Sequence, residues 1–276
     1  MKPGAQSSPS IVSQRGVSPL LEFRILGPVE VLNDGEEVPL DGSKPRTVLA
    51  ALLLADNGTV SDSEMSDFLW GHHPPATFNA QIYTYVSRLR KTLLHEVGIT
   101  RRSRGYDIRL GNCRFDLWEF EEQARLGQNA LAAGRYEESA GLLRSALSSW
   151  RGPALSGVSE HLTDAEGPRL EEARIAVLES RIEADLALGR HAQLLPELTR
   201  LVRQHPLQER FRAQLMTTFY RCNRQADALV LYEEGRRMLA DELGIDPGSL
   251  LRQVHLAILT ADPVLQVPHA LRVGVG

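Results

Sequence analysis

Residues 81–98, Q-I-Y-T-Y-V-S-R-L-R-K-T-L-L-H-E-V-G, combine a helical apolar period with a surface rich in hydrogen-bond donors. At about 100° per residue, one narrow arc holds the apolar side chains that we expect to be buried: Ile82, Val86, Leu89 and Leu93. The opposite side holds Ala80, Thr84, Ser87, Arg88 and Lys91, and Arg90 lies on its flank. A solvated helix face ordinarily mixes acids with bases, but the first carboxylate here is Glu96. Such a face could donate to phosphates and base edges, although taken alone it is also compatible with an ordinary solvated surface.

The charge of the chain is unevenly distributed around this stretch. The 276 residues have a formal net charge of −4, which argues against a generally basic surface for nucleic acid. Residues 19–83 hold ten acids and three bases, whereas residues 84–109 hold seven bases and two acids. The positive charge therefore lies on one expected helix and the segment that follows it, which indicates a local phosphate-attracting surface.

Strands, three helices and a hairpin are expected around the donor-rich helix. Asn33-Asp34-Gly35 predicts a tight hairpin turn, Gly27-Pro28 interrupts the strand before it, and Ser43 and Ser61 are candidate helix caps. Ser61 has an acid three residues on, a relative of the capping box. Helices are expected over about 43–54, 61–70 and 77–97, and β segments over 22–32, 36–40 and the basic hairpin 99–110.

This order of elements predicts a winged helix-turn-helix, whose third helix enters the major groove and whose hairpin reaches the backbone or the minor groove. Thr84 and Ser87 are short enough to let the helix approach the bases closely, and Arg88 and Lys91 can reach base acceptors or phosphate. Arg90, on the flank, is better placed for phosphate. The candidates in the wing are Arg101, Arg102 and Arg104. A face almost without carboxylates suits a duplex that carries one negative charge per roughly 1.7 Å, so binding to double-stranded DNA is favoured over a merely solvated surface.

The second half of the chain is expected to be a helical repeat. From about residue 115 the composition shifts to Ala, Leu, Glu and Arg, which are strong helix formers. Segments 131–140, 186–195 and 219–228 superimpose on Gly134, Gly189 and Asn223 as a helix end, a turn and a new helix. The step from 189 to 223 is the 34-residue tetratricopeptide period, and the longer first step includes the loop-like W-R-G-P-A-L-S-G-V at 150–158. The apolar residues of these segments are expected to form the repeat core.

Other kinds of chemistry find little support. Glycine-rich nucleotide loops, the zinc-protease helix motif and the nucleophile elbow are absent, so neither an enzyme nor a cofactor is expected. His72-His73 has no obvious third ligand, and two cysteines, Cys113 and Cys222, are too few for a thiolate metal site or a disulfide framework. Trp150 is either a packing anchor or part of a partner surface. Without a signal-peptide core or a membrane span, a cytoplasmic, nucleoid-associated protein with no membrane partner is expected.

Four motifs resemble a known family. L-W-G-x-x-P-P (69–75), Y-V-S-R-L-R-K (85–91) and G-Y-x-I-R-L (105–110) are similar to the OmpR-type DNA-binding domain of the Streptomyces antibiotic regulatory protein family. L-A-D-E-L-G-I-D-P-G (239–248) resembles the end of its bacterial transcriptional activation domain. The match covers about residues 20–260. Arg104 stands where members of the family usually have a proline, so we expect a wing tip that is differently shaped and more basic.

The resemblance implies a mainly α fold with small β elements, in which an N-terminal winged helix-turn-helix precedes an all-α tetratricopeptide-like domain. It implies a sequence-specific activator of an antibiotic biosynthetic gene cluster, which binds direct repeats near promoters as two head-to-tail protomers. The implied protein partner is the RNA polymerase holoenzyme with its sigma factor. The expected divisions are a disordered tail (1–18), the DNA-binding domain (19–112), the activation domain (113–262) and a C-terminal tail (263–276).

The same resemblance sets expectations for further domains. About 20 residues precede the first strand, so no receiver domain is expected there, and no ATPase domain of the larger members is expected after the repeats. The alternative interpretation is a helical-repeat adaptor whose winged domain binds protein. Basic residues confined to the third helix and the wing favour the DNA-binding activator.

Overall fold

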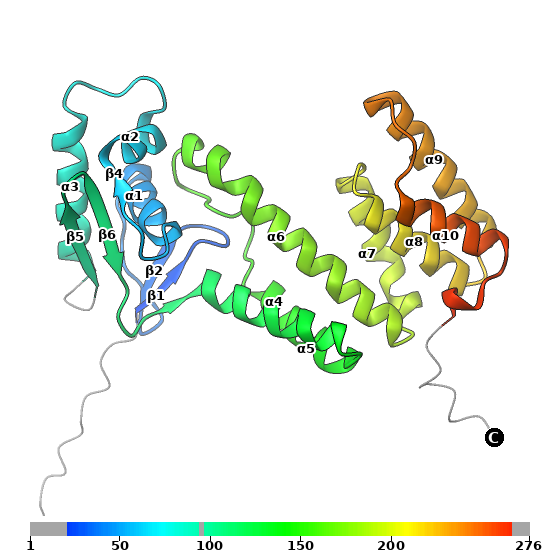
Figure 1. The fold of residues 1–276 in the computed structure, drawn as a ribbon. Helices are drawn as coiled ribbons and strands as arrows, with labels where there is room; N and C mark the ends of the chain where they lie inside the picture. The colour runs from blue at the N-terminus through cyan, green and yellow to red at the C-terminus, as the bar shows by residue number, and fades with distance from the viewer. Residues whose placement is uncertain (1–20, 94–96, 267–276) are drawn as a thin grey trace, which may run out of the picture.

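A computed structural model of the chain describes residues 21–93 and 97–266. The expected tail over 1–18, and residues 267–276 of the expected C-terminal tail, lie outside the described residues. The protein is mainly helical with small β elements, which confirms the predicted fold class (Figure 1). Among the described ranges, no helix is both long enough and apolar enough to cross a membrane.

The first part of the chain forms a winged helix-turn-helix, as predicted. Its elements are β1 (Leu21–Arg24), β2 (Glu30–Asn33), β3 (Glu36–Glu37), α1 (Ser43–Leu54), β4 (Val60–Ser61), α2 (Asp62–Trp70), α3 (Phe78–Thr92), β5 (Gly98–Arg102), β6 (Gly105–Arg109) and β7 (Arg114–Phe115). One sheet has the order β3-β2-β1-β7, and the other has the order β4-β6-β5. The hairpin of β5 and β6 is the wing, and it lies beside α3 at one end of the molecule (Figure 1).

Local signals explain most of these boundaries. The hairpin turn forms at Asp34 and Gly35, whose φ angles of 51° and 86° match the turn expected of Asn-Asp-Gly. The return strand is shorter than the predicted 36–40: its ladder with β2 covers Glu36 and Glu37, and one further backbone hydrogen bond runs from the Val38 N–H to the Val31 carbonyl. Ser61 makes a full capping box, since its hydroxyl accepts from the Glu64 N–H and its own N–H donates to the Glu64 carboxylate.

Two of the predicted helix limits need correction. Ser43 is not the cap of α1: Gly42 occupies the cap position with a φ of 85°, which glycine adopts readily, so Ser43 is already the first helical residue. The third helix ends at Thr92 rather than near residue 97, because the backbone leaves helical geometry at Leu93, whose N–H closes the last turn on the Leu89 carbonyl. Residues 94–96 of the predicted helix lie outside the described residues.

The second part is the predicted helical repeat. Its helices are α4 (Asp116–Ala132), α5 (Tyr136–Ser148), α6 (Glu160–Ala187), α7 (His191–Gln204), α8 (Glu209–Arg221), α9 (Gln225–Leu243) and α10 (Ser249–Leu259), followed by the 3-10 turn η1 (Pro263–Leu265). The superimposed positions Gly134, Gly189 and Asn223 lie in three equivalent turns with φ angles of 72°, 77° and 59°. The interval from Gly134 to Gly189 is longer than the next one because it contains the 28-residue α6 and the loop 150–158 that precedes it.

The loop 150–158 fastens the two parts of the chain together. It exchanges backbone hydrogen bonds with the segment between β1 and β2, among them Leu155 N–H to the Ile25 carbonyl at 2.9 Å. The buried Asp116 carboxylate accepts from the backbone N–H groups of Ile25 and Leu26 and from Arg151 at 2.9–3.2 Å. Burial raises the pKa of Asp116, and the hydrogen bonds from these donors offset part of that rise. One apolar core therefore runs from β1 as far as Val177 within α6.

Candidate nucleic-acid interface

Helix α3 presents the expected division between a buried stripe and a polar face. Ile82, Val86 and Leu89 are buried against the winged unit, as predicted. Thr84, Arg88 and Lys91 are exposed, and Ser87 is half-buried. No residue between Phe78 and Thr92 is acidic, and Glu96 lies outside the described residues. The helix therefore offers solvent a carboxylate-free face.

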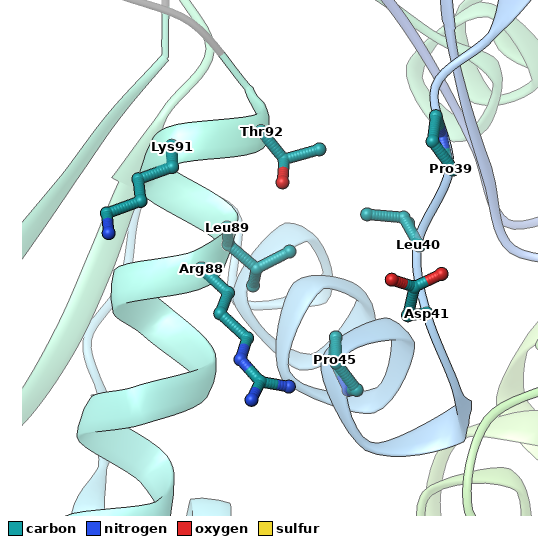
Figure 2. Close-up of a pocket in the computed structure, with 8 residues that line it drawn as sticks. All are labelled: Pro39, Leu40, Asp41, Pro45, Arg88, Leu89, Lys91 and Thr92. Carbon is teal, nitrogen blue, oxygen red and sulfur yellow. The ribbon is translucent and has the colours of Figure 1, made fainter.

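Arg88 and Lys91 are two exposed cations on the polar face of α3. Across residues 21–93 and 97–266, neither side chain takes part in an ion pair or a hydrogen bond. Both line a hollow of about 430 Å³ between α3 and the segment that leads into α1. Figure 2 shows Arg88 extending toward Pro45, whereas Lys91 points away from that segment. The two cations of α3 therefore point in different directions.

Two other α3 residues have part of their hydrogen-bonding capacity in use. The Thr84 hydroxyl donates to the Ala80 carbonyl at 2.8 Å, so toward a ligand it remains an acceptor. The Arg90 Nε donates to the Ile99 carbonyl at 2.9 Å, which ties α3 to β5 of the wing. That bond uses one of the five donors of the guanidinium, and the side chain remains exposed. Arg90 can therefore position the wing and still contact a phosphate.

The three predicted arginines of the wing differ in their surroundings. Arg104 lies in the exposed turn between β5 and β6, and within the described part of the chain it has no ion-pair partner. Arg101 makes a two-pronged ion pair with Asp62 at 2.5 and 2.7 Å. The hydrogen bond that Arg101 donates to Asp62 raises the pKa of the Arg101 guanidinium. In the free protein, Arg104 is therefore a more available cation than Arg101.

The third arginine of the wing has a structural partner. Arg102 pairs through its Nε with the Asp107 carboxylate at 2.6 Å. The Asp107 side chain is only 7% exposed, so the guanidinium neutralises a buried charge within the hairpin. The sequence places Arg102 and Asp107 in the same hairpin, but it does not show that the two side chains form an ion pair.

Gly105 sets the position of the wing against the start of α2. A Cβ at this position would lie 2.1 Å from the carbonyl oxygen of Val60, in the adjacent strand β4. Only glycine allows so close an approach of two backbones, which explains the glycine of the G-Y-x-I-R-L motif. The backbone N–H of Asp62 then donates to the Arg104 carbonyl at 2.9 Å, which joins α2 to the wing turn.

The structure adds two residues that sequence reasoning did not select. Tyr83 is 62% exposed, and Asn79 is exposed one turn before it. On a helical wheel the two residues lie within about 40° of each other and beside Arg90. Their positions on the flank of the polar face could therefore have been predicted from the sequence. Both residues, with Arg90, line a second hollow of about 460 Å³ between α3 and the wing.

The remaining candidates have ordinary surroundings. His72 and His73 are exposed in the connector between α2 and α3, and no cluster of potential metal ligands occurs in the portion of the chain that the structure describes. Trp150 packs edge-on against Phe120, with 5.6 Å between ring centroids, and the Arg174 guanidinium lies 5.0 Å from its ring. Trp150 is therefore a packing anchor.

A winged helix-turn-helix that presents a basic face and continues into a helical repeat is an architecture typical of bacterial transcription regulators. The family model described as the bacterial transcriptional activator domain matches residues 115–259. The regulatory protein DnrI of Streptomyces peucetius is 35% identical over 255 residues, which cover 88% of this chain and 93% of DnrI. The regulatory protein AfsR of Streptomyces coelicolor is 41% identical over 261 residues, but the matched part is only 26% of AfsR.

A solved structure shows the same arrangement. Mycobacterium tuberculosis EmbR in complex with a low affinity phosphopeptide superimposes with a TM-score of 0.82 and 34% identity, covering 89% of this chain and 66% of that chain. The protein belongs to the Streptomyces antibiotic regulatory protein family of transcriptional regulators, as its motifs predicted. The first relatives are longer: the chain spans about a quarter of the AfsR proteins and 64% of EmbR.

Proposed function

We propose that this protein is a sequence-specific activator that binds double-stranded DNA, with α3 in the major groove and the wing against the backbone or the minor groove. The observation that carries the proposal is the carboxylate-free face of α3, on which Arg88 and Lys91 are exposed and without an ion-pair partner in the described residues. Unpaired cations on such a face can bind base acceptors or phosphates without first breaking a contact within the protein.

The proposed readers and anchors follow from these surroundings. Arg88 and Lys91 contact bases or phosphates, while Thr84 and Ser87 allow close approach of the helix. Arg90 and the arginines of the wing, Arg101, Arg102 and Arg104, supply backbone contacts, with Arg104 the most available of the three. Phosphate contacts of this kind fix the register of a protein on the duplex and make its affinity dependent on salt.

We further propose a division of labour along the chain. Residues 19–112 bind the DNA, and residues 113–262 recruit the RNA polymerase holoenzyme with its sigma factor at promoters of an antibiotic biosynthetic cluster. The match of the activator-domain model to residues 115–259 supports this assignment. Two protomers bind direct repeats head to tail, so a probe with one repeat is expected to bind one protomer and to lose most of the affinity.

The test is a gel-shift titration against promoters of the neighbouring gene cluster at two salt concentrations, with wild type and Arg88→Glu. Selective binding that weakens steeply with salt and is lost in the variant supports the proposal. A folded, monodisperse protein that selects no promoter overturns it and favours the adaptor interpretation. In vitro transcription with purified holoenzyme tests recruitment separately from DNA binding.

A further inference from the structure

The hollow between α3 and the wing has the donor set of a phosphate site. It is lined by Asp62, Asn79, Tyr83, Arg90, Arg101 and Tyr106. Two guanidinium groups, a carboxamide and an exposed phenol can all donate hydrogen bonds to an anion. In the DNA-binding mode proposed above, α3 lies in the major groove and the wing lies against the backbone or the minor groove, so a strand of DNA backbone would pass between them. One lining residue, Asp62, is a carboxylate, and its negative charge would repel a phosphate bound in the hollow.

Asp62 holds one of these donors in an exchangeable contact. Its two carboxylate oxygens accept from Arg101 at 2.5 and 2.7 Å, with the guanidinium 4.7 Å from the centroid of the Tyr106 ring. The Arg101 side chain is 48% exposed, and ion pairs as exposed as this one are weak in water. Phosphate accepts the same two-pronged hydrogen bond from arginine that a carboxylate does. A backbone phosphate can therefore replace Asp62 without a change in the donor geometry of Arg101.

The carboxylate remains stabilised after such an exchange. Asp62 is the first residue of α2, where the unpaired N–H groups of the helix favour a negative charge. Its backbone N–H still donates to the Arg104 carbonyl, so the wing turn stays joined to the helix. After losing Arg101, the Asp62 carboxylate, which is 22% exposed, still lies at the end of the helix that favours a negative charge.

We propose, on the basis of the DNA-binding function proposed above, that this hollow is the seat of one backbone phosphodiester and that Arg101 exchanges Asp62 for that phosphate when DNA binds. Asp62 competes with DNA for Arg101 and repels the incoming phosphate. Since phosphates carry no sequence information, this competition lowers affinity for all duplexes alike. Asp62 thus lowers affinity for the promoter and for unrelated DNA by the same factor, while the base-contacting residues of α3 supply the preference for the promoter.

The experiment measures affinity for one promoter duplex and one unrelated duplex by fluorescence anisotropy at several salt concentrations. Asp62→Asn is expected to raise affinity for both duplexes by roughly two- to fivefold, the range of an exposed ion pair. Arg101→Gln is expected to weaken both and to lower the salt slope by about 0.9, the contribution of one phosphate. In the Arg101→Gln background, Asp62→Asn should have a clearly smaller effect, because its main target has been removed.

The matched control is Asp67→Asn, which makes the same charge change at an exposed position of α2 away from the wing hollow. An Asp62→Asn protein with unchanged or lower affinity overturns the proposal, as does an equal gain in the control or in the Arg101→Gln background. If Asp62→Asn does not fold, Asp62→Ser, which keeps a hydrogen-bonding side chain at the start of α2, takes its place and should raise both affinities in the same way. A wild type that binds no duplex refutes the proposed function itself, whereas normal wild-type binding without these effects refutes only the exchange.

Discussion

Replacing Arg88 with alanine gives a direct test of α3 as the reading helix. Arg88 is exposed and has no partner in the described residues, so Arg88→Ala should change the free energy of unfolding by less than about 0.5 kcal/mol. A lost two-pronged contact to guanine costs about 1–3 kcal/mol of binding free energy, or roughly 5- to 150-fold in Kd. The variant should therefore remain fully folded while it binds the promoter much more weakly.

The assay is a fluorescence anisotropy titration of a promoter duplex and an unrelated duplex at four salt concentrations. If Arg88 reads a base, affinity for the promoter falls more than affinity for the unrelated duplex, and the salt slope changes little. If Arg88 binds phosphate, both affinities fall alike and the slope decreases by about 0.9. The two roles are thus separated by one set of titrations.

The control is Arg200→Ala, which removes the same charge from an exposed position of α7, a helix at the other end of the molecule from α3 (Figure 1). Arg200→Ala should bind both duplexes with the affinity of wild type. If Arg88→Ala behaves like this control at every salt concentration, α3 does not contact DNA through Arg88 and the reasoning from its unpaired, exposed side chain is refuted.

Three further changes test the wing and the helical repeat. Gly105→Ala should destabilise the wing by about 2 kcal/mol or more, since its Cβ would overlap the Val60 carbonyl. Urea unfolding measures this loss of stability, and an unchanged unfolding midpoint would contradict the close approach of the two backbones. Arg102→Ala should lower the free energy of unfolding by about 1–2 kcal/mol, because it leaves the Asp107 carboxylate buried without a cation; this value is reduced for the exposure of the arginine. Asp107→Asn in the same background should restore part of the lost stability. Burial lowers the pKa of His191 below about 6.5, so its contribution to stability is present above that pH and is lost as pH falls through the folded-state pKa. Thermal melts between pH 7.5 and 5 should therefore show a steeper loss for wild type than for His191→Gln, and parallel curves would refute this role.

The sequence by itself determined the order of the main elements, without the short strands β4 and β7, and the polar face of the third helix. A helix exposes residues three and four apart on one side, so the separation of Ile82, Val86 and Leu89 from Thr84, Arg88 and Lys91 needs only local periodicity. Turn signals were equally local: Asn33-Asp34-Gly35 forms its hairpin, and Gly134, Gly189 and Asn223 all adopt positive φ. Asn79 and Tyr83 were accessible to the same reasoning, because the wheel places them beside Arg90.

Only the tertiary structure decided which of the basic residues are available. Asp62 and Arg101 are 39 positions apart, and they meet because β4 pairs with β6 and brings the start of α2 to the wing. The apolar core likewise continues past β7 into α6, because Asp116 and the loop 150–158 bind the segment between β1 and β2. Periodicity specifies which side of an element faces inward, but it does not specify which distant element lies there. For that reason the sequence predicted a basic helix and wing, and the fold alone distinguished the cations that are paired from those that have no partner among the described residues.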